Sequence, residues 1–139
     1  MHHDEFIGKV QALTRLPDRG TSEQATRAVL STLAERLPGG LAEHVAAQLP
    51  PTLAAPMREA KDSSSGERFG LTTFAGRIAG RARTDEDGAV REAAAVLEVL
   101  DAALAPELTE KVVAALPKDI GGLLPAARAV EDTAWSPHP

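Results

Sequence analysis

The only histidines in this 139-residue chain that fall in a pattern suited to chemistry stand at its start. Met1-His2-His3 places an imidazole at the third residue behind a free amine. That amine, two backbone nitrogens and the His3 side chain together make a square-planar nitrogen set that suits Cu(II) or Ni(II). The alternative is an accidental pair of exposed histidines. Met1, His2 and His3 are therefore weak metal candidates, and we predict no metal site beyond them.

No other group of residues has the spacing of a catalytic site. His44 follows Glu43, but no second histidine stands at a metal-binding spacing from it. "SSSG" at 63–66 lacks both the GxxxxGK[ST] frame and the preceding strand of a phosphate-binding loop, so a linker is the better interpretation. We predict no catalytic residue, no cofactor and a protein that is not an enzyme.

Arginines suggest a different kind of site. Arg77 and Arg81 are four residues apart and would share one helix face. If the helices expected near 4–15 and 71–83 lie together, their cations form one basic surface for a phosphate, an acidic protein or RNA. The members of this predicted surface are Lys9, Arg15, Arg68, Arg77, Arg81 and Arg83. The alternative is a solvated face that nearby acids balance.

Composition favours helices and a cytoplasmic location. Alanine and leucine, which are strong helix formers, dominate the apolar residues, whereas aromatic residues make up 3% of the chain. A net charge of −5 argues against nucleic acid as a partner. No apolar run approaches the roughly 18 residues of a membrane span, and the acidic start does not resemble a signal peptide. We expect an all-α, soluble, cytoplasmic protein with no membrane partner.

The second half of the chain repeats the first. With a shift of 67 positions, eleven of the 23 residues from 28 to 50 have identical counterparts, and the upstream part matches with a shift of 68. We predict a tandem duplication of a roughly four-helix unit, packed into one compact helical domain with pseudo-two-fold symmetry. The expected parts are a first repeat at 1–60, a linker at 61–68, a second repeat at 69–130 and a flexible tail at 131–139.

Each repeat has expected helix boundaries. In the first, helices are expected near 4–15, from a capping box at 21–24 to about 37, over 41–49, and after Pro50-Pro51. In the second they are expected near 71–83, 84–104 and 106–116, and Gly121-Gly122 should interrupt the last one. His44 and Lys111 stand at matching positions of the third helices. A position that holds either residue should face solvent.

Two further features predict close contacts. Gly8 precedes Ala12 by four residues, and Gly76 precedes Gly80 in the same way, which would leave grooves where helices pack closely. The second helix of the second repeat carries an apolar arc that is wider than a one-sided contact requires, including Val99. We therefore expect a homodimer that covers this arc.

The chain resembles a bacterial family known as domain of unknown function 2267. The resemblance rests on "DEF" at 4–6, "ATRAVLSTLAERL" at 25–37, "VAAQLPPTL" at 45–53 and "ERFGLTTFAGRIA" at 67–79. It implies an all-helical fold and supplies no activity. We predict a non-enzymatic interaction or structural module with a protein partner, with bacterial stress as one setting. The alternative is a regulatory protein that binds a small ligand or anion between the repeats.

Overall fold

Eight α-helices and no strand form the part of the chain, residues 1–125, that the computed structural model describes. The helices are α1 (His3–Thr14), α2 (Arg19–Arg36), α3 (Gly39–Ala47), α4 (Pro51–Ser63), α5 (Leu71–Ala82), α6 (Glu86–Ala103), α7 (Pro106–Ala115) and α8 (Lys118–Gly121). The predicted all-α class is confirmed. The predicted tail at 131–139 and the last five residues of the predicted second repeat, 126–130, lie outside the described residues. None of these eight helices has the length and apolarity that crossing a membrane requires.

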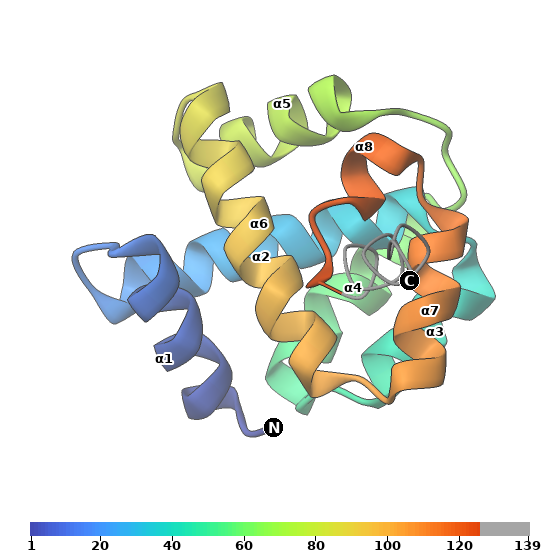
Figure 1. Cartoon of the computed structure of the whole chain (residues 1–139), viewed down its shortest axis with the longest axis horizontal. Helices are drawn as coiled ribbons and strands as arrows, with labels where there is room; N and C mark the ends of the chain where they lie inside the picture. The colour runs from blue at the N-terminus through green and yellow to red at the C-terminus, as the bar shows by residue number, and fades with distance from the viewer. Residues whose placement is uncertain (126–139) are drawn as a thin grey trace, which may run out of the picture.

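The two long helices, α2 and α6, pack against each other (Figure 1). α1 and α5 each lie against both long helices, while α4 packs on α2 and α3, and α3 also contacts α7. Apolar side chains from both halves, such as Phe6 and Leu37 from the first and Phe74 and Leu104 from the second, belong to one buried cluster. The two halves of the chain therefore share a core.

The start of α2 differs from the prediction. The expected capping box at 21–24 is wrong, because α2 begins at Arg19. The N-cap is Asp18, which has an extended backbone and accepts a hydrogen bond from the Thr21 N–H at 2.8 Å. Aspartate is a stronger N-cap than threonine, so α2 begins after Asp18 and the predicted box falls inside the first turn.

Matching elements of the two halves have similar lengths and ends. α1 and α5 both end before an arginine in the left-handed region, Arg15 (φ 57°) and Arg83 (φ 56°). α2 and α6 both span 18 residues and both have an aspartate N-cap, Asp18 and Asp85. These pairs agree with the shifts of 67 and 68 positions, and the duplication with its pseudo-two-fold axis stays a prediction.

The fourth helices differ most between the halves. α4 spans 13 residues, whereas α8 spans four and ends before Gly122, so the predicted interruption is confirmed. Asp119 in α8 accepts a hydrogen bond from the backbone N–H of Leu71 at 3.0 Å. The short helix thus provides a partner for one of the free N–H groups at the start of α5.

The predicted linker at 61–68 is partly helical and partly bonded to α2. α4 continues through Ser63, and the following chain runs along the C-terminal end of α2. The Gly66 N–H donates to the Leu37 carbonyl at 2.8 Å, and the Glu67 N–H donates to the Glu35 carbonyl at 3.0 Å. Carbonyls at a helix end lack partners within the helix, so this segment supplies them.

The glycines of α1 and α5 lie on open faces, and the predicted close packing is wrong. A Cβ atom built at Gly8, Gly76 or Gly80 would meet no heavy atom within 4 Å. Since α1 and α5 lie against α2 and α6 through their apolar faces, the glycines point to the other side.

We therefore expect Gly76→Ala and Gly80→Ala each to raise the free energy of unfolding by about 0.5–1 kcal/mol through helix propensity. Urea denaturation of the single and double variants measures the gain. Gly66→Ala is the matched control, because Gly66 also has free space but a φ of 67°. It should lose stability, and losses at Gly76 and Gly80 would contradict the open-face assignment.

The apolar arc of α6 is buried inside the chain. Val96, Leu97 and Leu100 are fully buried, and Val99 is 3% exposed. α6 packs against α1, α2 and α5, which accounts for the width of the arc. The homodimer stays a prediction, but this arc no longer supports it.

Candidate functional site

Several charged side chains meet where α5 crosses α2. Glu35, near the end of α2, is 14% exposed at its side chain and accepts hydrogen bonds from two arginines of α5. Arg77 reaches it at 3.1 Å, and Arg81 binds both its carboxylate oxygens at 2.9 and 2.8 Å. The spacing of four residues places both guanidinium groups on the face of α5 that meets α2.

The same cluster extends to the segment before α5. Arg77 also donates to Glu67 at 2.7 Å, and Ser64 donates its hydroxyl to the other Glu67 oxygen. These hydrogen bonds hold the pKa of Glu67 below its usual range, and the bond to Glu67 is the main reason that the pKa of Arg77 is raised. We call Glu35, Glu67, Arg77 and Arg81 the arginine–glutamate network. In it, each guanidinium group has a carboxylate partner.

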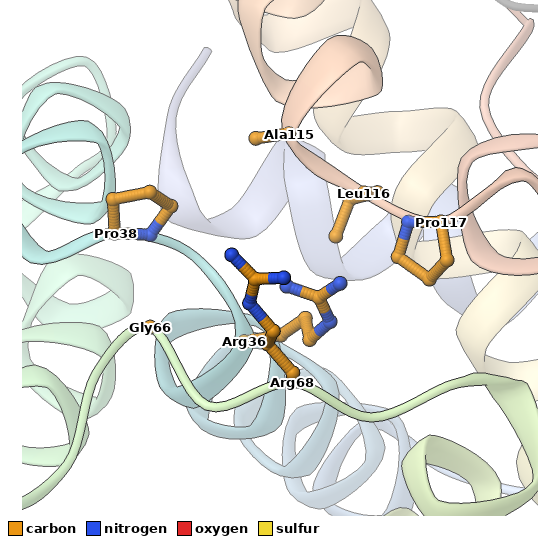
Figure 2. Close-up of a pocket in the computed structure, with 7 residues that line it drawn as sticks. All are labelled: Arg36, Pro38, Gly66, Arg68, Ala115, Leu116 and Pro117. Carbon is orange, nitrogen blue, oxygen red and sulfur yellow. The ribbon is translucent and has the colours of Figure 1, made fainter.

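A pocket of about 400 Å³ lies beside this network, at the junction of the two halves. Figure 2 shows the guanidinium groups of Arg36 and Arg68 projecting into the space between Pro38 and the turn at Leu116-Pro117. Its lining is Arg36, Pro38, Gly66, Arg68, Ala115, Leu116 and Pro117. We call it the Arg36–Arg68 pocket. It has two cations in its lining and no carboxylate.

The structure separates the members of the predicted basic surface. α1 and α5 do not lie side by side, because both long helices are packed between them (Figure 1). On α1, Lys9 pairs with Glu5 at 3.5 Å, and Arg15 follows the helix end. Arg77 and Arg81 belong to the arginine–glutamate network, Arg83 follows the end of α5, and Arg68 lines the Arg36–Arg68 pocket.

Of the N-terminal metal candidates, His3 is engaged in other contacts. The His3 Nδ1 atom lies 2.7 Å from the Thr52 hydroxyl, and Nε2 lies 3.3 Å from a Glu23 oxygen. A square-planar site built on the terminal amine would have to break the Thr52 contact. Within residues 1–125 no group of three or more His, Asp or Glu side chains has a metal-binding arrangement. His44 and Lys111 are both exposed, as their matching positions predict.

Sequence reasoning missed Glu35, Arg36, Glu67 and Phe69 as parts of this region. Glu35 and Arg77 are 42 residues apart, so no local pattern connects them. Positions at which the two halves carry different residue types would have been a signal for these residues. Ala102 and Ala103 stand in the second half where the first has Glu35 and Arg36, and Leu13 stands where α5 has Arg81.

Comparison with known proteins gives a family and no activity. No curated protein matches the chain. The sequence model of one family, described as "Uncharacterized conserved protein (DUF2267)", matches residues 3–123. This match covers most of the chain and includes all eight helices up to the end of α8. The chain therefore belongs to the DUF2267 family of uncharacterised conserved proteins.

Proposed function

We propose that the protein is a non-enzymatic helical module that acts by holding a protein partner, with two duplicated units joined into one body. The observation that supports a structural rather than a catalytic role is the arginine–glutamate network. Its charged groups lie at the junction of the halves and bind one another at 2.7–3.1 Å. Groups engaged in this way position helices, whereas acid–base catalysis needs a group that is free to exchange a proton with a substrate.

Cross-linking in the native host tests this proposal. The tagged full chain is cross-linked in living cells, and its partners are compared with those of a Phe74→Asp variant. Phe74 is fully buried, so this variant unfolds and reports the chaperones that bind any unfolded chain. We expect one protein to be recovered in amounts comparable to the folded chain and absent from the control. Recovery of chaperones alone, together with turnover of a metabolite by the purified protein, would contradict it.

A second candidate function is the binding of an anionic ligand between the halves. The specific observation in its favour is the Arg36–Arg68 pocket, whose two arginines face a common space. The predicted basic surface supports this function less, because its members Arg77 and Arg81 already have carboxylate partners.

A further inference from the structure

We propose that the Arg36–Arg68 pocket binds a phosphate monoester with a small apolar body. This inference deepens the second candidate function and does not depend on the first. It begins from the charges around the pocket. Within residues 1–125 neither Arg36 nor Arg68 takes part in an ion pair, whereas Arg77 and Arg81 do.

Three other hollows of the described surface have a different charge pattern. Each of three pockets of about 260–410 Å³ has an acid among its lining residues as well as a base. The pairs are Glu23 with Arg27, Glu107 with Lys111, and Glu98 with Arg91. The Arg36–Arg68 pocket thus concentrates positive charge on a chain whose net charge is −5. Two guanidinium groups in one pocket repel each other, and an anion between them would offset this repulsion.

Contacts made by Arg36 and by the neighbours of Arg68 hold both arginines in place. The Arg36 Nε atom donates to the Phe69 carbonyl at 2.8 Å, which leaves its two terminal nitrogens for the pocket. Arg68 lies between two residues that are themselves held. Glu67 binds Arg77, and the centre of the Phe69 ring lies 4.3 Å from the Arg77 guanidinium carbon. The arginine–glutamate network therefore positions the backbone from which Arg68 extends, and such preorganisation lowers the entropic cost of binding.

Charge and shape select the ligand class. A phosphate monoester carries a charge of about −1.5 to −2 at neutral pH, which matches two guanidinium groups, whereas a carboxylate matches one. The remaining lining is apolar, from Pro38 on one side and Ala115, Leu116 and Pro117 on the other. A volume of about 400 Å³ falls at the lower end of small-molecule sites, which span roughly 300–1,000 Å³. A phosphate head with a single ring or short apolar body fits both features.

Calorimetric titration of the full chain with phenyl phosphate, inorganic phosphate and benzoate tests the proposal. We expect phenyl phosphate to bind most tightly, because it alone combines the dianionic head with an apolar body. Arg68→Gln should weaken its affinity about tenfold or more, as loss of a charge-assisted contact does. Arg68 is exposed and makes no hydrogen bond in the described part of the chain, so this variant should keep the wild-type melting temperature.

Arg83→Gln is the matched control, since it removes the same charge from an exposed arginine away from the pocket. Its affinity for phenyl phosphate should equal that of the wild type. Equal affinities of wild type and Arg68→Gln would overturn the assignment of the site and leave anion binding elsewhere. Absence of phenyl phosphate binding to the wild type at millimolar concentration would overturn the site and the second candidate function together. Tighter binding of benzoate than of phenyl phosphate would overturn the ligand class.

Discussion

Glu35→Gln should lower the free energy of unfolding by about 2–3 kcal/mol, because it leaves two guanidinium groups without their shared carboxylate. Glu35 is 14% exposed, while Arg77 and Arg81 are 31% and 38% exposed at their side chains. The loss of stability should therefore be smaller than the loss caused by breaking a fully buried ion pair. Urea denaturation at neutral pH measures it, and a cycle with Arg81→Gln should show that the two losses do not add.

Glu43→Gln is the matched control for this variant. Glu43 pairs with Arg58 at 3.1 Å, but both side chains are more than 40% exposed. Water and salt screen such a pair, so its removal should have a much smaller effect on the unfolding midpoint than removal of Glu35. Equal midpoints for the two variants would show that the arginine–glutamate network does not join α2 to α5.

Local patterns were enough to place most helices. The repeat of the helix near 4–15 predicted a helix over 71–83, where α5 spans Leu71–Ala82, and Pro50-Pro51 predicted the start of α4 at Pro51. These boundaries follow from helix periodicity and from the fixed φ of proline, which act within a few residues. The start of α2 was misplaced because two good caps compete there, and only the backbone of Asp18 decides between them.

Local sequence patterns could not predict contacts between residues that are far apart in the chain. The glycines of α5 suggested a close approach, but which face of a helix meets its neighbour depends on how all the helices pack. The predicted basic surface failed to form for the same reason, since α2 and α6 lie between α1 and α5. Arg68 was identified as a candidate by its charge alone. Its neighbour in space, Arg36, lies at the end of α2, whereas Arg68 lies in the segment between α4 and α5.

Glu92 stands out as a charged residue in the apolar part of α6. It is 5% exposed, and its Oε2 atom has no hydrogen-bond partner in the described part of the chain. The matching residue of the first half is Ala25, which is 1% exposed. Burial raises the pKa of Glu92 above its ordinary value of 4.5, and the charge of Arg91 opposes this shift only in part.

Glu92→Met should raise the free energy of unfolding at pH 7 by about 1–3 kcal/mol, because it removes a buried acceptor that lacks a partner. Methionine has a similar length and favours helices, so the packing of α6 should be kept. Urea denaturation of both proteins measures the gain. Loss of stability at pH 7 would mean that the Glu92 carboxylate has a favourable partner.

The gain in stability from Glu92→Met should increase as pH rises. Because the folded pKa of Glu92 is raised, the unfolded state releases its proton first as pH rises above about 4.5. Wild type then loses stability relative to Glu92→Met until pH exceeds the folded pKa, and the difference levels off above it. Near pH 4 the carboxyl is mostly protonated in both states, so the gain should be smallest there. Glu110→Gln, at an exposed glutamate on α7, is the control for the loss of a carboxylate from an exposed position. A gain that is equal at pH 4 and pH 7 would show that Glu92→Met acts through packing rather than through the buried charge.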